Sequence, residues 1–421
     1  MINRRDFLLG GIAISNGFSF AHAKNISKNA HVVIIGAGWG GLSFAKTLRY
    51  LDKNCKITII DKQNEFISCP MSNWVIGQIK NMSDITFSFE YFADKQEIEI
   101  INDEVKLVDT FKKIISLKKY TLNYDKLVIS PGVEMNIDSI IGLKEAYDGK
   151  KVLSAWKAGK ETSVLSKMVK NIVDGQNIII SIPLSPYRCP PGPYERASLI
   201  ADHIKTNKIN SKVIILDANQ KIISKRNLFK KAWDDYYKDI IEYYPDSRVI
   251  EINGKEKKVY TDFDEYKYDI ANIIPKQQAP NFLKKSGLVE KNRSWAKVNS
   301  RDFSSHLSND VYILGDSTDR STVGSVPKSG YIAYSMGKAA AFSVYSSLLG
   351  KPSPSPSIIN TCYSLVSKKE GISVSAIYKY SKEKDRIISV KNASGTSPFR
   401  SKLIAKNAWD WAQSIWADML T

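Results

Sequence analysis

The chain has 421 residues, of which 43% are hydrophobic, 25% charged and 10% aromatic, which excludes a disordered, collagen-like or disulfide-dense protein and allows two or three domains. Its formal net charge of +18 favours anionic partners, but the lysines are scattered, which is more typical of a uniformly lysine-rich protein. The sequence contains no zinc-finger, RRM or helix-turn-helix pattern, so we do not expect nucleic acid as a partner.

Residues 1–23 are predicted to be a twin-arginine signal peptide. Arg4 and Arg5 precede an apolar stretch over residues 7–20, and the segment ends in the small-x-small pattern of residues 21–23. The apolar stretch is shorter than the ~20 residues of a membrane span and is interrupted by polar residues, so we expect cleavage and no stable membrane insertion. Twin-arginine export carries folded proteins, and the expected location is the periplasm.

The segment HVVIIGAGWGGLSFAKTLRYL predicts a dinucleotide-binding turn between a strand and a helix. Gly36 permits the tight turn, Gly38 lets the backbone approach a pyrophosphate, and Gly41 lets the helix pack on the strand. A second strand, KITIID, ends at Asp61, about twenty residues further on, where an acidic side chain would bind ribose hydroxyls.

Two later segments favour FAD over NAD as the dinucleotide. YDKLVISPG (124–132) is similar to the strand that closes the first FAD segment in flavoproteins with two dinucleotide-binding domains. VYILGDS (311–317) is similar to their later strand, whose aspartate, here Asp316, binds the ribityl chain. We therefore expect a discontinuous FAD-binding domain, made of residues 29–150 and 286–345, with a second α/β domain over residues 151–285.

The second α/β domain is expected to lack a nicotinamide site. It begins with QNIIISIPLSPYRCPPGPYERAS, in which prolines stand where an NAD-binding domain has its phosphate-binding glycines. A further strand, KVIILDANQ, follows from residue 212, so the fold itself is expected to persist. The predicted fold class is α/β, with two Rossmann-like domains of the glutathione reductase type and a C-terminal interface domain over residues 346–421.

The four cysteines are Cys55, Cys69, Cys189 and Cys362. The sequence has no C-x-x-C motif and no closely spaced set of cysteines and histidines, so neither a zinc site nor covalent haem is expected on this chain. In an oxidising compartment each cysteine can form a disulfide, remain a free thiol or be covalently attached to a cofactor. Cys55 directly precedes the second strand and is expected to be a small buried or edge residue without a catalytic role.

The other three cysteines lie in distinctive segments: FISCPMSNWVIG (66–77), YRCPPGPYERAS (187–198) and NTCYSLVSKKEGISVSAIY (360–378). Together with PKSGYIAYSMGKAAA (327–341), these segments resemble the flavoprotein subunit of flavocytochrome c sulfide dehydrogenase. The resemblance covers essentially the whole chain beyond the signal peptide. Many flavoproteins share the glycines of the first strand, whereas the cysteine segments are specific to this family and its nearest relatives.

The resemblance implies that the Cys69 sulfur is bonded to the 8α carbon of FAD, and that Cys189 and Cys362 form a redox-active disulfide beside the flavin. It also implies that sulfide is the substrate and that a c-type cytochrome subunit accepts the electrons. The alternatives are a free thiol at Cys69 and a purely structural disulfide, which would stabilise the fold by ~4 to 5 kcal/mol. The prolines around Cys189 favour the redox role, because a fixed sulfur is well placed for attack by hydrosulfide.

Three charged residues near these segments have open roles. Glu195 is either a proton acceptor near the flavin or a carboxylate that complements the dipole of a helix N-terminus. Arg196 is expected to form an ion pair, with a catalytic role as the alternative. Lys328 either places a cation at the pyrimidine edge of the flavin or is an ordinary lysine in the first turn of a helix.

The tail NAWDWAQSIWADML places Trp409, Trp416 and Leu420 near one face of a helix. Core packing is the commoner meaning of such a stripe, and a docking or dimer surface is the alternative. Two other functions also remain open. A sulfide:quinone oxidoreductase would need an amphipathic membrane surface, and a non-catalytic flavin-binding partner of a sulfur-oxidation system would bind FAD without being reduced by sulfide.

Overall fold

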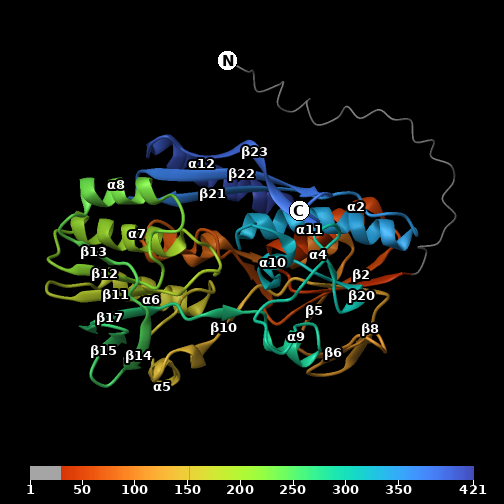
Figure 1. Ribbon diagram of the computed structural model, residues 1–421, viewed down its shortest axis with the longest axis horizontal. Helices are drawn as coiled ribbons and strands as arrows, with labels where there is room; N and C mark the ends of the chain where they lie inside the picture. The colour runs from red at the N-terminus through yellow and green to blue at the C-terminus, as the bar shows by residue number, and fades with distance from the viewer. Residues whose placement is uncertain (1–29, 151) are drawn as a thin grey trace, which may run out of the picture.

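The computed structural model describes residues 30–150 and 152–421, so the predicted signal peptide (1–23) lies outside the described residues. Two α/β lobes lie side by side, and a C-terminal β-sheet lies across both of them (Figure 1). Within the described part of the chain, no helix is long and apolar enough to cross a membrane.

The first lobe is built on a six-stranded sheet with the order β19-β20-β9-β1-β2-β5. Strands β1, β2, β5 and β9 pair in parallel, and β20 joins β9 in parallel, which returns the chain to this lobe after the second lobe is complete. The sheet thus draws on both segments that the sequence assigns to the first dinucleotide-binding domain. The strands are β1 (His31–Ile35), β2 (Lys56–Asp61), β5 (Glu99–Asn102), β9 (Lys126–Ile129), β19 (Ser304–Ser305) and β20 (Ser308–Ile313).

Shorter elements surround this sheet. The hairpins β3-β4 and β6-β7-β8 are antiparallel, and β10 pairs with β18 between the lobes. Their bounds are β3 (Glu65–Ile67), α3 (Ser72–Ile76), β4 (Thr86–Ser88), α4 (Glu90–Gln96), β6 (Val105–Asp109), β7 (Ile114–Leu117), β8 (Thr121–Asn123), β10 (Glu134–Met135), β18 (Gln277–Gln278), α9 (Asn281–Lys285), the 3-10 helix η3 (Gly315–Ser317) and α10 (Arg320–Val323).

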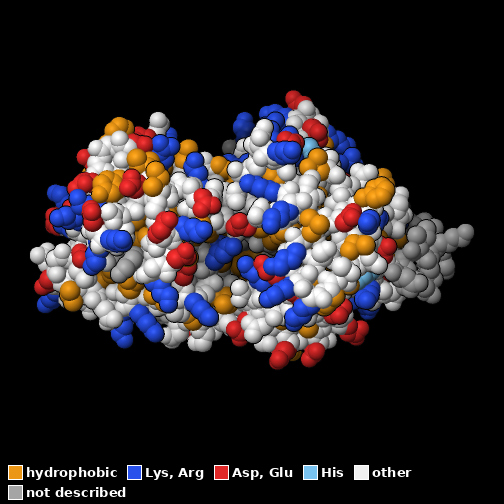
Figure 2. Space-filling view, turned by 90° about the horizontal axis from the view of Figure 1, so that it is seen from below, with side chains coloured by type: hydrophobic (Ala, Val, Ile, Leu, Met, Phe, Trp, Pro, Cys, Tyr) orange, Lys and Arg blue, Asp and Glu red, His pale blue; other side chains and the backbone are white. Residues whose placement is uncertain are grey.

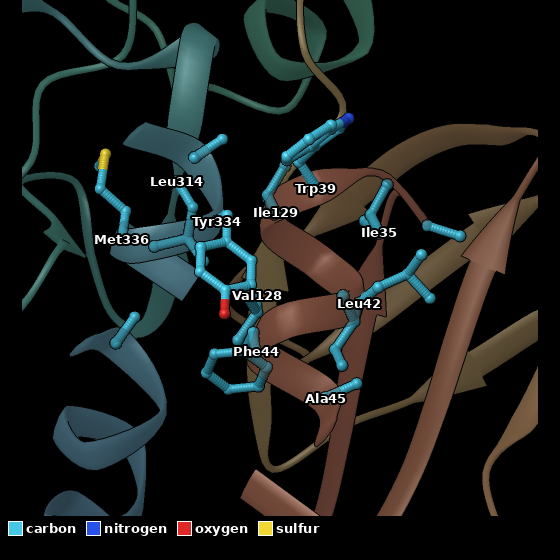
Figure 3. Packing of buried hydrophobic residues seen from close by; sticks show 14 of the residues in the cluster. Ile35, Trp39, Leu42, Phe44, Ala45, Val128, Ile129, Leu314, Tyr334 and Met336 are labelled. Carbon is cyan, nitrogen blue, oxygen red and sulfur yellow. The ribbon is translucent and has the colours of Figure 1, made fainter. Parts of the chain in front are cut away.

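Two long helices cover one face of the first sheet. They are α2 (Trp39–Leu51), which carries Leu42 and Phe44 into the core, and α11 (Gly330–Leu348), which contributes Tyr334 and Met336 to the same core (Figure 3). The helices cross closely, because a Cβ atom on Gly337 would overlap the carbonyl oxygen of Gly40. The crossing holds the start of α2 against the sheet, where the predicted glycine turn lies.

The second lobe contains a four-stranded parallel sheet with the order β13-β12-β11-β17. Its strands are almost entirely apolar, as expected for a parallel sheet that helices cover. The predicted α/β class with two Rossmann-like domains is therefore confirmed. The elements are α5 (Leu143–Asp148), α6 (Lys160–Lys170), β11 (Asn177–Ile182), α7 (Gly192–Thr206), β12 (Lys212–Asp217), α8 (Arg226–Tyr236), β13 (Ile241–Tyr244), β17 (Ile270–Ile273) and the antiparallel β14 (Val249–Asn253), β15 (Lys258–Thr261) and β16 (Glu265–Lys267).

The C-terminal unit connects the two lobes through their hydrophobic cores. It consists of the antiparallel strands β21 (Ser357–Leu365), β22 (Gly371–Ser381) and β23 (Arg386–Thr396), followed by α12 (Lys402–Leu420). Ile358 and Ile387 are buried in the core of the first lobe, whereas Val366 and Ile372 are buried in the core of the second. Strand β21 therefore runs along the junction between the lobes.

The aromatic stripe of the tail packs inward. Trp416 and Leu420 are buried in the first core, and the Trp416 ring lies 5.2 Å from that of Phe87. Trp409 stacks on Trp74 at a centroid distance of 5.7 Å. Trp416 and Leu420 therefore pack as the core interpretation predicts, whereas Trp409 is half-buried and the docking surface stays an untested alternative.

Replacing Trp416 by alanine should lower the free energy of unfolding by ~3–5 kcal/mol, because a large buried side chain leaves a cavity. Urea unfolding monitored by circular dichroism measures this change. Leu403→Ala in the same helix is the control: Leu403 is 66% exposed, so its loss should change stability by less than ~0.5 kcal/mol. Equal unfolding midpoints for the two variants would contradict the packing role of α12.

Candidate active site

A cavity of about 580 Å³ lies where the two lobes and the C-terminal sheet meet. Its walls come from the turn after β1, the ends of β2 and β9, the loop between β11 and α7, the segment before α11 and the strands β21 and β22. Nearly all predicted site residues line this cavity: Gly36, Gly38, Asp61, Cys69, Cys189, Glu195, Asp316, Lys328 and Cys362.

The glycine turn after β1 has the geometry that its spacing predicts. Gly36 has φ +103°, and a Cβ atom on it would overlap the carbonyl oxygen of Ser130. No described atom lies within 4 Å of the position where a Cβ of Gly38 would stand, so the turn is open towards the cavity. A Cβ atom on Gly41 would overlap the carbonyl oxygen of Gly36, so only glycine allows the helix to pack this closely on the strand.

Two carboxylates mark the ends of strands at the cavity. Asp61 ends β2 and accepts hydrogen bonds from Ala37 N at 2.7 Å and Gln63 N at 2.8 Å. Asp316 is buried, and its Oδ1 accepts no hydrogen bond from any described residue. Burial raises the pKa of both carboxyl groups. A buried oxygen without a partner costs ~1–3 kcal/mol, so Asp316 is suited to accept a hydrogen bond from a ligand hydroxyl.

Lys328 fixes the turn that carries Asp316. Its Nζ donates to the carbonyl oxygens of Asp316 at 2.6 Å and Thr318 at 2.7 Å, and it lies 3.7 Å from the ring centroid of Trp295. Burial lowers the pKa of Lys328 to about 7. These contacts direct the ammonium group to the protein backbone, and its predicted place at the flavin edge stays a prediction.

Cys189 is held rigidly in the loop between β11 and α7. Its φ of 56° lies in the left-handed region, which costs a residue with a side chain ~1–2 kcal/mol. Its N donates to Lys328 O at 2.8 Å, and its O accepts from Gly192 N at 2.9 Å. A Cβ atom on Gly192 would stand 3.0 Å from Cys189 Sγ and 2.8 Å from the Trp156 ring, so this glycine leaves room for the sulfur.

Cys362 lies on β21 and reaches the same cavity as Cys189 from the opposite end of the sequence. Both residues are free thiols in this structure. Burial is the main cause that raises the pKa of each thiol, and the neighbouring Cys362 raises that of Cys189 further. The fold therefore brings the predicted pair together, and the disulfide itself stays a prediction.

Glu195 is buried in the first turn of α7 beside both cysteines. Its carboxylate accepts hydrogen bonds from Asn73 Nδ2 at 3.0 Å, Trp74 Nε1 at 3.3 Å and Leu365 N at 2.8 Å. Burial raises its pKa, which these three donors oppose. Glu195 thus links α7 to α3 and to β21. Sequence reasoning missed Asn73 and Trp74, although both belong to the segment that contains Cys69.

Arg196 differs from its predicted role. It is fully buried, and its guanidinium donates to neutral acceptors: Asn73 Oδ1 at 3.0 Å, Asn272 Oδ1 at 2.7 Å, Ser154 O at 3.1 Å and Ala155 O at 2.8 Å. It makes no ion pair with any residue that the structure describes, so the predicted ion pair is wrong. Burial lowers its pKa to about 9.

The remaining cysteines take the two positions that their segments predict. Cys69 follows β3, lines the cavity and accepts a weak hydrogen bond from Ala158 N at 3.5 Å through its sulfur. Cys55 is buried in the first core, away from the cavity, in agreement with its expected packing role. Among residues 30–150 and 152–421, no group of three or more His, Cys, Asp or Glu side chains is arranged to hold a metal ion.

The second lobe uses its own side chains where a dinucleotide domain binds ribose. Asp217 ends β12, the position at which such a domain has its ribose-binding carboxylate. The Asp217 carboxylate accepts hydrogen bonds from Tyr194 Oη at 2.7 Å, Tyr243 Oη at 2.9 Å and Asn219 N at 2.9 Å. Protein groups thus occupy the carboxylate that would bind ribose, and the loop after β11 lacks the phosphate-binding glycines as well.

Sequence reasoning also missed Lys225, which directly precedes α8. Its Nζ donates to Ser364 Oγ at 2.8 Å and to Cys362 O at 3.2 Å, and it lies 3.9 Å from Cys362 Sγ. A lysine in a polar loop carries no local signal for such a contact, because its partners are more than a hundred residues away in the sequence.

The sequence matches three family profiles. They are "Sulfide dehydrogenase [flavocytochrome c] flavoprotein chain, central" over residues 162–275, "Flavocytochrome c sulphide dehydrogenase, flavin-binding" over residues 354–420, and "Pyridine nucleotide-disulphide oxidoreductase" over residues 30–172. Together the three matched regions include the glycine turn and all three cysteines of the cavity.

Individual relatives are more distant. The mitochondrial sulfide:quinone oxidoreductase of Dictyostelium discoideum is 24% identical over 314 residues, which cover 71% of this chain and 67% of that protein. The coenzyme A disulfide reductase of Staphylococcus aureus (strain MRSA252) is 24% identical over 298 residues, which cover 68% of this chain and 63% of that protein. The chain thus aligns with about two thirds of the length of these relatives.

Solved structures share the fold. The sulfide:quinone oxidoreductase of Aquifex aeolicus superposes with a TM-score of 0.75 at 19% identity, covering 93% of this chain and 91% of that one. NDH2 of Plasmodium falciparum in complex with NADH gives a TM-score of 0.69 at 13% identity, covering 93% and 97%. These likenesses establish the fold, with its two α/β domains and C-terminal unit.

The described residues fit a bound FAD. The open turn at Gly38 leaves room for a pyrophosphate at the start of α2, and Asp61 stands at the end of the next strand. The unpartnered Oδ1 of Asp316 is available for a ribityl hydroxyl.

The lowered pKa of Lys328 predicts a dependence of stability on pH. Because its pKa is about 7 in the folded protein and ~10.4 in the unfolded chain, the folded state binds fewer protons between these values. Its contribution to the free energy of unfolding should therefore rise with pH from ~7 to ~10, by at most ~1.4 kcal/mol per pH unit, and is lost in Lys328→Met.

Urea unfolding at several pH values between these limits measures the slope for the wild-type protein and for Lys328→Met. The exposed Lys230 gives the control variant, Lys230→Met, which should keep the wild-type slope. Parallel slopes for wild type and Lys328→Met would show that Lys328 titrates normally.

Proposed function

Since this chain belongs to the family of flavoprotein subunits of flavocytochrome c sulfide dehydrogenase, within the pyridine nucleotide-disulfide oxidoreductases, we propose that it oxidises sulfide by using FAD and a disulfide between Cys189 and Cys362. One observation carries this proposal. The two cysteines line the same cavity as Gly38, Asp61 and Asp316, the residues that fit FAD.

The cofactor site consists of the glycine turn, Asp61 and Asp316, and FAD bound there supplies an acceptor for two electrons. Cys69 is the proposed covalent attachment point, through a thioether to the 8α carbon. Its support is the position of Cys69 on the cavity wall after β3, together with the resemblance of its segment to the family. A covalent cofactor would also stay with a protein that is exported in the folded state.

The sulfur chemistry begins with attack of hydrosulfide on the disulfide. The attack forms a bond between the substrate sulfur and one cysteine sulfur and breaks the bond between Cys189 and Cys362. One cysteine becomes a persulfide and the other a thiolate, so the disulfide is reduced and the substrate sulfur is oxidised. The rigid loop supports this step, because the left-handed backbone and the hydrogen bond to Lys328 O hold Cys189 in one orientation.

Glu195 is the proposed proton acceptor for this chemistry. Three hydrogen bonds fix its carboxylate beside the two thiols, and burial raises its pKa towards the range in which it can exchange a proton near neutral pH. The position in the first turn of α7 also places the carboxylate at a helix N-terminus, so both roles predicted from the sequence apply to the same residue.

The proposed electron acceptor is a c-type cytochrome subunit, which takes electrons one at a time. The family descriptions support this acceptor, and the predicted signal peptide supports a periplasmic encounter. Figure 2 shows Lys and Arg side chains together with Asp and Glu side chains around the hollow between the two lobes, so the charge of this surface does not by itself select the acceptor. The alternative acceptor is quinone, which the likeness to sulfide:quinone oxidoreductases supports.

Sulfide added without oxygen to the purified holoprotein should bleach the visible absorbance of its flavin. Reoxidation by added c-type cytochrome, but not by a short-chain quinone, supports the proposed acceptor, and the reverse result supports the quinone alternative. Flavin that binds but does not bleach with sulfide would instead support the non-catalytic flavin-binding partner.

Cys189→Ser should abolish bleaching by sulfide and leave reduction by dithionite unchanged, because dithionite does not need the disulfide. Absorbance spectra recorded during both titrations measure the difference. Cys55→Ser is the matched control, since Cys55 is buried away from the cavity, and it should bleach as the wild type does. Normal sulfide turnover in Cys189→Ser would refute the disulfide mechanism.

Cys69→Ser should release its flavin on denaturation, whereas the wild-type protein should keep flavin bound to the denatured polypeptide. Separation of the denatured chain from small molecules, followed by flavin fluorescence of both fractions, measures the attachment. Flavin that leaves the denatured wild-type chain would exclude the covalent bond at Cys69.

A further inference from the structure

The loop after β12 carries a buried lysine to the cysteine pair. Lys225 is 6% exposed and lies directly before α8, with a left-handed φ of 54°. Its ammonium group reaches β21, where it contacts Ser364 Oγ, Cys362 O and Cys362 Sγ at 2.8, 3.2 and 3.9 Å. Two of its three polar contacts are thus with atoms of Cys362.

The charge of Lys225 is directed at this strand. Lys225 makes no salt bridge with a carboxylate of the described residues, and its direct contacts are two neutral oxygens and the cysteine sulfur, while the Glu195 carboxyl interacts with its charge from further away. Burying a cation costs free energy, and a negative charge nearby offsets part of that cost. Cys362 Sγ is the contacting atom that becomes negative when its thiol ionises.

The two cysteines have different charged surroundings. Cys362 faces Lys225 at 3.9 Å and the Glu195 carboxyl from α7. Cys189 faces Cys362 itself, Glu195, the more distant Lys225 and Arg188 of its own loop, whose guanidinium donates to the carbonyl oxygen of Trp156. Of these two sulfur atoms, only Cys362 Sγ lies within hydrogen-bond distance of a cationic side chain of the described residues.

We propose that Lys225 is a positioning residue that stabilises Cys362 as the departing thiolate, so that hydrosulfide attacks Cys189 and the persulfide forms on Cys189. This inference rests on the proposed sulfide oxidation and adds which sulfur takes each role. The conformation of Cys189 agrees with this assignment, because two hydrogen bonds hold its backbone in the left-handed region at the cavity wall.

The step balances as follows. A bond forms between the sulfur of hydrosulfide and Cys189 Sγ, and the bond between Cys189 Sγ and Cys362 Sγ breaks. The electron pair of the broken bond goes to Cys362 Sγ, while the proton of hydrosulfide stays on the new persulfide. Lys225 keeps its protons and donates a charge-assisted hydrogen bond to the thiolate, and a stabilised thiolate is the better leaving group in such an exchange.

The first test measures the reactivity of Cys362 against pH. In the reduced holoprotein with Cys189→Ser, iodoacetamide labels Cys362, and mass spectrometry follows its peptide separately from those of Cys55 and Cys69. Adding Lys225→Met to this variant should raise the pH midpoint of labelling by about one unit. At pH values below the midpoint, iodoacetamide should then label Cys362 about tenfold more slowly. A merely structural role would leave this midpoint unchanged.

Two further variants control this measurement. Lys225→Arg keeps the positive charge, so its labelling midpoint should stay close to that of Cys189→Ser alone. Lys230→Met removes an exposed lysine of α8, the helix that follows Lys225, and should leave the midpoint unchanged. Equal midpoints for Lys225→Met and its background would overturn the inference.

The second test uses the wild-type holoprotein and does not depend on any variant. The oxidised protein receives one equivalent of sulfide without oxygen, is trapped with iodoacetamide and is digested for mass spectrometry. A persulfide adduct on the Cys189 peptide supports the inference. An adduct on the Cys362 peptide overturns it but leaves the proposed function intact, whereas a wild-type protein without an adduct on either cysteine contradicts the disulfide mechanism itself.

Discussion

The hydrogen bond from Cys189 N to Lys328 O joins the loop of the second lobe to the segment that precedes α11 of the first. The same Lys328 holds the turn of Asp316 through its ammonium group, so one residue positions both the reactive sulfur and a predicted cofactor-binding carboxylate. Strand β21 completes the arrangement, because Leu365 N binds Glu195 from the second lobe while neighbouring residues pack in the first core. The cavity exists only where these three parts of the chain meet.

Three buried polar groups in or next to the cavity wall have a charge that is only partly compensated. Asp316 has a carboxylate oxygen without a described partner, Arg196 is surrounded by neutral acceptors, and Lys225 reaches a cysteine sulfur. Each of these groups lowers the stability of the protein without ligands, since burial removes the water that would solvate its charge. Buried groups of this kind are enriched at functional sites, which agrees with the proposed roles of Asp316 and Lys225.

The second lobe keeps a dinucleotide-binding fold but contributes side chains to the cysteine pair. Its ribose-position carboxylate, Asp217, is occupied by the hydroxyl groups of Tyr194 and Tyr243. The loop after β11 carries Cys189 where phosphate-binding glycines would stand, and the segment after β12 ends in Lys225, which reaches the partner cysteine. One of the two elements that would hold a nicotinamide dinucleotide thus brings Cys189 to the shared cavity, and the other brings Lys225 into contact with Cys362.

The sequence by itself determined the features whose physical cause is local. The spacing of Gly36, Gly38 and Gly41 predicted the open turn, and the apolar strands predicted two parallel sheets, because these depend on neighbours a few residues away. The family resemblance identified the three cysteines of the cavity. Only the tertiary structure decided that Arg196 binds neutral oxygens, that the Trp416 face packs inward and that Lys225 contacts Cys362. The reason is that these contacts join segments far apart in the chain, and a sequence pattern carries no record of which distant side chains packing will bring together.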